Sequence, residues 1–385
     1  MKLKARPQDF KVVERLVRAP DGQGAWGLYR VTKRDLSTLE VQRQLAQVLN
    51  APTRQVVFPA LKDKAAVAVQ YATLPAHAPD RLIGHGYEAD RVGYWPRPLA
   101  PSDLAGNRFT LTVRDLSNDE AARLQAGLVA VSTQGLPNYF DEQRFGSYAP
   151  GWGYVGKAIL QRDAERAIYG YMAVPFAGDV RSVAAFKRRA AALWPNWRAI
   201  MEIAPRPSNW RSVLTYLIDH PDGYRKALNL IPARLLALYL AAYQSALWNS
   251  MLSAALQADT GQASSGQIQV ADQRLAVPRA AATWSAAEVP LPSAQARYEA
   301  PFKDAAASVL AAEGLSLADL KARILERAYL ARSTRPVWCR PVDLAVSGPL
   351  PDELFAGRQK LDVSFGLGRG SYATLIVKVA AVRGG

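Results

Sequence analysis

The sequence contains very few of the residues that form disulfides and metal centres. Its 385 residues include one cysteine, Cys339, and three histidines, His77, His85 and His220. A single cysteine cannot form an internal disulfide, which is typical of proteins from a reducing cytoplasm. The histidines are scattered, and no group of cysteine and histidine has the spacing of zinc ligands. We therefore expect a cytoplasmic protein without a bound metal.

Long apolar runs are missing as well. The N-terminal stretch MKLKARPQDF has no apolar core of signal-peptide length, and the longest apolar run, LLALYLAAY from Leu235, is too short to span a bilayer. Apolar residues still make up 49% of the chain, which is enough for a packed core. The sequence therefore predicts a soluble globular protein that does not enter a membrane.

Acidic residues are clearly outnumbered by basic ones. The chain has 48 Lys and Arg against 33 Asp and Glu, a net charge of +15, and a pI near 9.9. The basic residues are spread along the chain and do not form a tail. Because Lys and Arg bind phosphates by releasing counterions, nucleic acid is the first partner to expect. A generally basic proteome is the alternative explanation of the charge.

The first 150 residues combine strand and helix patterns. Residues 10–14 and 26–31 alternate apolar with polar side chains, and the turn residues APDGQG between them predict a hairpin or two neighbouring strands. Thr38 is the expected N-cap of a helix that runs to Leu49. Further strands are expected at 55–58 and 108–114, and a further helix at 118–131.

The character of the sequence changes between about residues 155 and 332, where Ala- and Leu-rich helical patterns follow one another. Inside this segment, residues 255–280 are rich in Gln, Ser and Gly and predict a polar loop or a small β excursion. Strand patterns return at 342–346, 360–365 and 374–379. These strands are too few and short for a domain of their own, so we expect one β-containing domain split by a helical insertion. The expected segments are 1–154, 155–332 and 333–385.

A charged triplet interrupts one apolar stretch. Lys62, Asp63 and Lys64 stand between apolar residues 56–58 and 65–69. A solvated turn is the ordinary interpretation, because charged side chains usually lie at the surface. The alternative is a functional carboxylate held among apolar neighbours, where no hydration shell competes with a substrate.

Three stretches of the chain together point to a known family. They are LKDKAAVAVQY at 61–71, PNYFDEQRFG at 137–146 and GRGSYATLIVK at 368–378, and they resemble the TruD family of tRNA pseudouridine synthases. The resemblance implies an α+β fold in which a pseudouridine synthase catalytic domain, with a mixed and mainly antiparallel sheet, is interrupted by a mainly helical insertion domain. It also implies tRNA as the substrate and no cofactor; we expect a monomer. Further matching stretches are LKARPQDFKVVE, AGNRFTLTVR, YQSALWN and RPV at 335–337.

The resemblance also implies the reacting group. The family's catalytic carboxylate matches Asp63, and the expected product is pseudouridine, in bacterial members at uridine 13 of the D arm. Asp63 would attack C1′, add to C6, or remove the C2′ proton, and the sequence leaves these three routes open. Each route needs an ionised carboxylate, which a nearby cation favours. The resemblance implies that Lys378, expected on a C-terminal strand, is this cation.

Further side chains are expected to contact the substrate. In the resemblance, Phe140 and Asn138 line the active site, and Phe10 and Phe365 match substrate-contacting phenylalanines. Because an enzyme that acts on a base in folded RNA must flip the base out, aromatic faces recover part of the lost stacking. The remaining candidates for substrate contact are Lys62 and Arg144, and Arg144 alternatively pairs with a neighbouring carboxylate.

Two other classes of function are weighed against this one. A non-catalytic RNA-binding or RNA-remodelling protein on the same fold has no need of the set formed by Asp63, Phe140 and Lys378. A glycoside hydrolase requires two converging carboxylic acids and does not explain the charge of +15. The predicted function is therefore that of a tRNA pseudouridine synthase, an isomerase.

Overall fold

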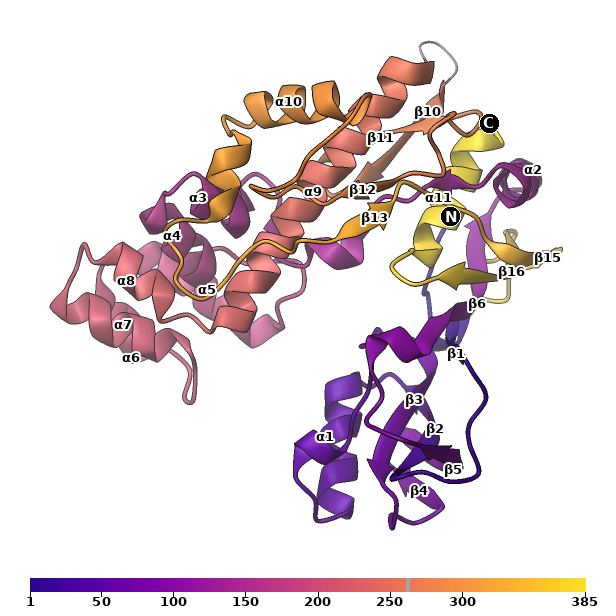
Figure 1. The fold of residues 1–385 in the computed structure, drawn as a ribbon, viewed down its shortest axis with the longest axis horizontal. Helices are drawn as coiled ribbons and strands as arrows, with labels where there is room; N and C mark the ends of the chain where they lie inside the picture. The colour runs from indigo at the N-terminus through magenta and orange to yellow at the C-terminus, as the bar shows by residue number, and fades with distance from the viewer. Residues whose placement is uncertain (261–263) are drawn as a thin grey trace. The chain divides into compact units, whose positions relative to one another are not determined.

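The computed structural model describes residues 1–260 and 264–385 (Figure 1). The chain divides into two compact units. Unit 1 comprises Met1–Leu136 and Cys339–Gly385, and unit 2 comprises Pro137–Trp338. The boundaries expected from the sequence, 154/155 and 332/333, lie inside unit 2, and the domain division itself stays a prediction. The two-residue strands β7 (Leu136–Pro137) and β14 (Trp338–Cys339) stand where the chain passes from one unit to the other.

Unit 1 is built on an eight-stranded sheet with the order β15-β16-β6-β1-β3-β2-β5-β4. Only β1 and β3 are parallel, and the other neighbours are antiparallel. The α+β class with a mixed, mainly antiparallel sheet is thus confirmed. The strands are β1 (Phe10–Leu16), β2 (Trp26–Arg34), β3 (Val67–Pro75), β4 (Arg81–Gly84), β5 (Tyr87–Trp95), β6 (Leu104–Leu116), β15 (Val342–Pro351) and β16 (Gln359–Gly368).

Three α-helices pack on this sheet. Helix α1 (Thr38–Val48) buries Val41 and Leu45 against β2 to β5. Helices α2 (Asn118–Gln134) and α11 (Ala373–Arg383) pack against each other beside β6, β15 and β16. Their backbones approach so closely that a Cβ atom at Gly127 would lie 1.8 Å from the carbonyl oxygen of Ala380. Glycine is therefore required at this crossing. The short 3₁₀ helices are η1 (Pro7–Asp9), η2 (Thr53–Gln55) and η3 (Pro101–Asp103).

Four local expectations for unit 1 are wrong. Strands β1 and β2 are not neighbours, because β3 lies between them. Residues 55–58 do not form a strand; η2 ends there, and only a single bridge joins Val57 to Thr73. Residues 374–379 belong to helix α11, whose buried, apolar sequence cannot be told from a buried strand by periodicity. The N-cap of α1 is Ser37, which forms a capping box with Glu40.

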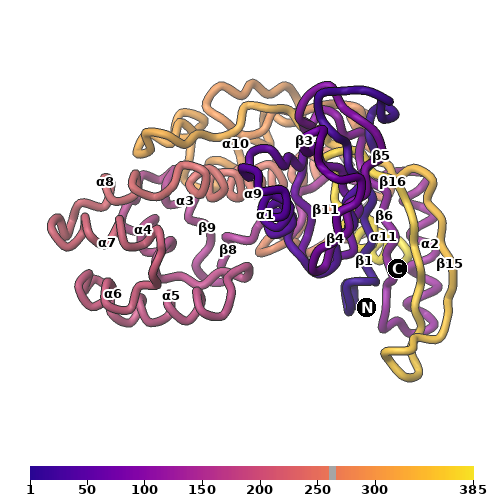
Figure 2. The backbone as a smooth tube through the Cα atoms, turned by 90° about the horizontal axis from the view of Figure 1, so that it is seen from below, coloured from indigo at the N-terminus to yellow at the C-terminus, as the bar shows by residue number. Residues whose placement is uncertain are grey.

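Unit 2 is mainly helical. The long helix α9 (Ala233–Thr260) carries the longest apolar run, and the short helices α3 to α8 gather around one end of it (Figures 1 and 2). The other helices of the unit are α3 (Val155–Leu160), α4 (Ala164–Ala173), α5 (Arg181–Leu193), α6 (Trp197–Ile203), α7 (Trp210–Asp219), α8 (Tyr224–Asn229), α10 (Phe302–Ala312) and the 3₁₀ helices η4 (Glu142–Phe145) and η5 (Leu317–Lys321).

Small antiparallel ladders complete unit 2. The segment expected as a polar loop or β excursion contains the hairpin of β10 (Ser264–Val270) and β11 (Gln273–Pro278), while residues 261–263 of that expectation lie outside the described residues. Strand β12 (Glu288–Pro290) pairs with β13 (Thr334–Pro336), and β8 (Tyr148–Ala149) pairs with β9 (Gly153–Tyr154).

Candidate functional site

Asp63 lies in the irregular segment between η2 and β3 of unit 1. Its Oδ2 atom is 2.5 Å from Nζ of Lys4, and the two side chains are 32% and 23% exposed. The carboxylate is thus neither fully solvated nor fully buried. A carboxylate that pairs with a cation and stays accessible can act as nucleophile or base.

Lys4 is held on its other side by an aromatic ring. Its Nζ lies 4.2 Å from the centroid of the Phe10 ring, in cation–π geometry. Lys4 adopts a positive φ of 57°, so the backbone turns just before η1. The ammonium group therefore stands between Phe10 and Asp63.

A buried lysine supports the backbone of the same loop. Nζ of Lys33, on β2, donates to the carbonyl oxygen of Asp63 at 2.6 Å, and only 1% of Lys33 is exposed. Burial lowers the pKa of Lys33 to about 8, and the Asp63 carboxylate partly opposes this shift. Lys33 therefore remains mostly charged at neutral pH, and its hydrogen bond fixes the main chain at Asp63.

A buried ion pair anchors Lys62, the residue before Asp63. Nζ of Lys62 is 2.7 Å from Oε1 of Glu14, with side-chain exposures of 11% and 0%. The other carboxylate oxygen of Glu14 accepts a hydrogen bond from the Tyr71 backbone N–H at 2.8 Å. Lys62 was predicted to contact substrate; in the structure its ammonium group ties the loop to β1 and β3.

Neutral side chains complete the support of the loop. The Lys62 backbone N–H donates to Oγ1 of Thr38 at 3.0 Å, and the Thr38 hydroxyl donates to Oε1 of Gln70 at 2.8 Å. The amide nitrogen of Gln70 donates to the Ala60 carbonyl oxygen at 2.9 Å. The loop is thus bonded to helix α1 and strands β1, β2 and β3, and its position is determined by elements that enter the core.

Three phenylalanines form a row on neighbouring strands. The rings of Phe10 and Phe109 meet edge to face at 6.0 Å, and those of Phe109 and Phe365 lie 5.8 Å apart. Phe10 is 5% exposed and Phe365 is fully buried. Phe10 and Phe365, both predicted to contact substrate, are brought together by Phe109, and Phe10 is the one in contact with Lys4.

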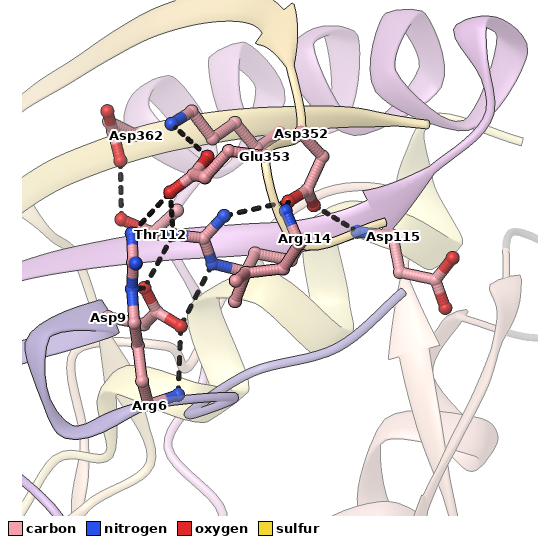
Figure 3. Close-up of polar contacts among 10 residues, drawn as sticks. Arg6, Asp9, Thr112, Arg114, Asp115, Asp352, Glu353 and Asp362 are labelled. Atoms are coloured by element: carbon pink, nitrogen blue, oxygen red, sulfur yellow. Dashed lines mark hydrogen bonds and ion pairs between the residues drawn. The ribbon is translucent and has the colours of Figure 1, made fainter. Parts of the chain in front are cut away.

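The segment that carries Lys4 and Phe10 is fixed by a buried ionic cluster around Arg114 of β6 (Figure 3). Arg114 is 1% exposed and binds Asp9 through two nitrogens, at 2.9 and 3.0 Å. It also binds Asp352 at 2.8 Å and Glu353 at 2.9 Å, both in the loop between β15 and β16. Hydrogen bonds from Arg114 and Lys360 lower the pKa of Glu353 and keep it ionised. Since Asp9 ends η1 and Phe10 begins β1, the cluster sets the course of the N-terminal segment.

Lys378 lies on helix α11 and not on a strand, and its side chain is half-buried. Helix α11 belongs to unit 1, as does Asp63. One ion pair of the Asp63 carboxylate is with Lys4. The role of Lys378 as the partner cation stays a prediction.

In unit 2 the PNYFDEQRFG segment is fastened to helix α9. The backbone N–H of Phe140 donates to Oδ1 of Asn249 at 2.8 Å, and Nδ2 of Asn249 donates back to the Phe140 carbonyl at 2.9 Å. The Phe140 ring packs edge to face on Trp248 at 5.8 Å and is 6% exposed. Phe140 therefore contributes to the core of unit 2, and its contact with a base stays a prediction.

Arg335 joins the same segment to β13. Its guanidinium group donates to the carbonyl oxygens of Asn138 and Tyr139, at 2.8 and 3.1 Å, and to Oδ1 of Asn138 at 2.9 Å. It also lies 4.0 Å from the centroid of the Phe140 ring. Asn138 is 2% exposed and its Nδ2 donates to the Pro336 carbonyl, so its described bonds are within the protein.

Arg144 is half-buried on η4. Its Nε donates to Oγ of Ser245 at 3.0 Å, and its guanidinium carbon lies 5.5 Å from the Phe140 ring centroid. The partner of Nε is thus a hydroxyl on α9 and not a neighbouring carboxylate. Contact of Arg144 with a phosphate stays a prediction.

Sequence reasoning missed several residues of this arrangement. Glu14 shares the buried face of β1 with Phe10 and Val12, and Lys33 shares the buried face of β2 with Tyr29 and Val31. A charged side chain at a buried position of an alternating strand was the available signal. Lys4, Arg335 and Asn249 lie inside stretches that carried the family resemblance but were given no role.

The described residues, 1–260 and 264–385, contain no cluster of three or more His, Cys, Asp or Glu arranged to hold a metal ion. Among these residues, no helix has both the length and the apolar character needed to cross a membrane.

Comparison with known proteins extends over the whole chain. The family model described as tRNA pseudouridine synthase D (TruD) matches residues 1–379. The tRNA pseudouridine synthase D of Geobacter sulfurreducens is 30% identical over 99% of this chain and 94% of its own. The "Probable tRNA pseudouridine synthase D 1" of Methanococcus maripaludis is 27% identical over 98% of both chains. A crystal structure of a candidate TruD protein from Methanosarcina mazei has a TM-score of 0.73, with 22% identity over 99% of this chain and 93% of that one. The family resemblance and the predicted fold are therefore confirmed.

Proposed function

The chain belongs to the TruD family of tRNA pseudouridine synthases, and from this premise we propose that Asp63 is the carboxylate with which it isomerises a uridine of folded tRNA. The activity of the family is that of an isomerase acting on tRNA. We place the reacting uridine at position 13 in the D arm, as the resemblance to the bacterial members implies.

The chemistry explains why one carboxylate suffices. The N1–C1′ bond of uridine breaks, the uracil turns, and C5 bonds to C1′; C5 loses its proton and N1 gains one, so no electrons are gained or lost and no redox group is consumed. Asp63 attacks C1′, adds to C6, or removes the C2′ proton, and each of these routes uses its ionised form. The observation that carries the proposal is the ion pair of Asp63 with Lys4 on a loop whose backbone is held by Lys33.

The basic residues near Asp63 have different parts in this proposal. Lys4, at 2.5 Å, pairs with the carboxylate and orients it. Lys378 acts as a second cation from helix α11. Lys62 positions the loop, because its ammonium group binds Glu14. The backbone at Lys62 faces the substrate more than the ammonium group does.

The aromatic and amide residues bind the target nucleotide in this proposal. Phe10, next to Lys4, stacks with the flipped base, and Phe365 supports it through Phe109. In unit 2, Phe140 and Asn138 shape the PNYF segment that approaches the nucleotide, and Arg144 contacts a phosphate. RNA therefore contacts both units.

The test is the variant Asp63→Asn, compared with Asp222→Asn, which removes an equal charge from an exposed residue of unit 2. Single-turnover pseudouridine formation is measured on one tRNA transcript with saturating enzyme, and binding is measured separately. We expect no product with Asp63→Asn, binding equal to or slightly tighter than wild type because one negative charge is lost near a polyanion, and full activity with Asp222→Asn.

Near-normal turnover by Asp63→Asn would refute the catalytic assignment. Absence of product with the wild-type chain as well, together with intact binding, would instead favour a non-catalytic RNA-binding protein on this fold. The position of the modified uridine is read by mapping pseudouridine in the same transcript.

A further inference from the structure

Unit 2 contains a cavity of about 600 Å³, and Arg144 is the one residue of its lining to which the proposed function gives a role. Its walls come from η4, the C-terminal end of α4 with the loop that follows, α5, the start of α7 and the first half of α9. This volume is within the range of about 300–1,000 Å³ that is usual for small-ligand sites. The cavity lies wholly inside one unit, so its walls belong to one compact body.

Four aromatic side chains contribute to the lining, namely Tyr171, Phe176, Trp210 and Tyr239. Tyr171 and Trp210 lie 6.1 Å apart between ring centroids, and Phe176 and Tyr239 lie 6.0 Å apart. Leu238, at the side of α9, is 54% exposed. Such a lining suits a flat ring that stacks and packs against aromatic surfaces.

The charged residues of the lining, Arg144, Lys187 and Asp179, leave one net positive charge. Lys187 is 3% exposed, and its Nζ is 2.8 Å from Oδ2 of Asp179 and 3.8 Å from the Phe176 ring centroid. Burial lowers the pKa of Lys187, and Asp179 opposes this shift. Arg144 is the remaining charged residue of the lining. The cavity therefore favours a neutral ring that carries an anionic substituent near Arg144.

Two polar atoms of the lining have no hydrogen-bond partner among the described residues. They are the hydroxyl of Ser208 and the indole Nε1 of Trp210, both buried and both at the start of α7. A buried polar atom without a partner destabilises a protein, so such an atom is commonly explained by a group that binds it. The indole requires an acceptor, and the hydroxyl takes either an acceptor or a donor.

We propose that this cavity binds one unpaired nucleobase of the substrate RNA, in addition to the uridine that reacts. A nucleobase is a neutral heteroaromatic ring with acceptors and donors on its edge, and its phosphate is the anion that Arg144 takes. The choice of RNA as the source of this base rests on the proposed function and on the net charge of +15. Holding a second base would fix the register of the RNA on unit 2 while the target uridine is presented to Asp63.

The test removes the two unpartnered atoms one at a time, in Ser208→Ala and Trp210→Phe. The control is Trp284→Phe, which removes another buried indole N–H without a partner, on a residue outside this cavity. Affinity for a tRNA transcript, thermal unfolding without RNA, and chemical protection of unpaired bases in the complex are measured for the full chain. Ser208→Ala keeps the test valid if Trp210→Phe disturbs packing on Phe186, whose ring centroid is 4.5 Å away.

We expect Ser208→Ala and Trp210→Phe to bind tRNA about 5- to 30-fold more weakly than wild type. Protection of one unpaired base other than the target should be lost in both variants. Ser208→Ala should have a melting temperature equal to or above that of wild type. A hydroxyl with a purely structural role would lower the melting temperature when it is removed. Trp284→Phe should bind normally.

Binding of both variants within twofold of wild type, with unchanged base protection, would overturn the proposal. Equal affinity of the wild-type chain for uridine monophosphate and for tRNA would overturn it as well, since the cavity would then be a small-molecule site. Neither measurement depends on turnover. Failure to form pseudouridine would therefore refute the proposed function, while the binding and protection results could still be interpreted.

Discussion

Replacing Lys33 by Met should slow catalysis while leaving stability nearly unchanged. Lys33 is 1% exposed, and its hydrogen bond to the Asp63 carbonyl is the direct link between β2 and the catalytic loop. Met has a similar length, so the core stays filled, but the carbonyl loses its donor. The substitution therefore separates the placement of Asp63 from the packing of unit 1.

The magnitude follows from two opposing effects. Lowering the pKa of Lys33 from 10.5 to about 8 means that keeping this amine charged in the folded protein costs about 3 kcal/mol. A hydrogen bond from a charged donor contributes about 1.5–3 kcal/mol. Removing both together changes the free energy of unfolding by no more than about 1–2 kcal/mol. If about 2 kcal/mol of the hydrogen bond is expressed in the transition state, the single-turnover rate falls about 30-fold.

The pH dependence gives an independent readout. Because the pKa of Lys33 is lower in the folded than in the unfolded chain, the unfolded chain binds more protons between about pH 8 and pH 10.5, and stability attributable to Lys33 rises with pH over this range. The rate should do the opposite: above about pH 8 the neutral amine is a weaker donor to the Asp63 carbonyl. Lys33→Met should lack this decline.

The assay is single-turnover pseudouridine formation from pH 6 to 9.5 with saturating enzyme, alongside urea unfolding. Lys64→Met is the matched control, because Lys64 is an exposed residue of the same loop. Rates of Lys33→Met within threefold of wild type, or a high-pH decline that persists in this variant, would refute the reasoning.

Three further predictions concern other parts of the molecule. Arg114→Leu leaves the carboxylates around it without their buried partner and should lower the free energy of unfolding by about 3–5 kcal/mol at pH 7. The loss should shrink below about pH 4.5, because Arg114 is the largest cause of the lowered pKa of Glu353 in the folded chain, and urea unfolding at both pH values will show it. Phe140→Leu should cost about 1–2 kcal/mol of stability as well as turnover, because its ring packs under Arg335; unchanged unfolding would contradict this packing role. Lys4→Met, which removes a cation 2.5 Å from Asp63, and Lys378→Met should each slow single-turnover catalysis, and a rate within threefold of wild type in either variant would remove that lysine from the proposed support of Asp63.

Much of the fold was readable from the sequence because its patterns were local. The alternation in β1, β2 and β6 and the helical pattern of α2 predicted these elements, and β15 and β16 were expected near their observed places. Helix α11 was mistaken for a strand because it is apolar on almost every side, so its periodicity carries no information. Pairing order was not readable either: β3 inserts between β1 and β2 although it follows them in the chain, and no local pattern encodes that choice.

The candidate site was readable only in part, for a different reason. Asp63 was recognised because a family motif surrounds it, but its described partner, Lys4, is 59 positions away in the sequence. The supporting residue Lys33 donates to a main-chain carbonyl, an interaction that depends on where the chain lies and not on which residue is there. Substrate contact by Phe365 and Asn138 stays a prediction, and their burial could not be predicted because it depends on the strands and segments that come to cover them.

The charges beneath Asp63 are best understood together. Lys33, Lys62 and Glu14 are all nearly removed from water, and burying ionised groups costs free energy that apolar residues of the same size would avoid. Their bonds, however, end on particular atoms: Lys33 binds the Asp63 carbonyl of the loop, and Glu14, which pairs with Lys62, binds the Tyr71 amide of β3. An apolar core beneath the loop would be as stable but would leave the loop free to slide, because dispersion contacts have no preferred direction. The polar support therefore favours one position of the carboxylate, at the expense of stability that the large apolar core of unit 1 supplies.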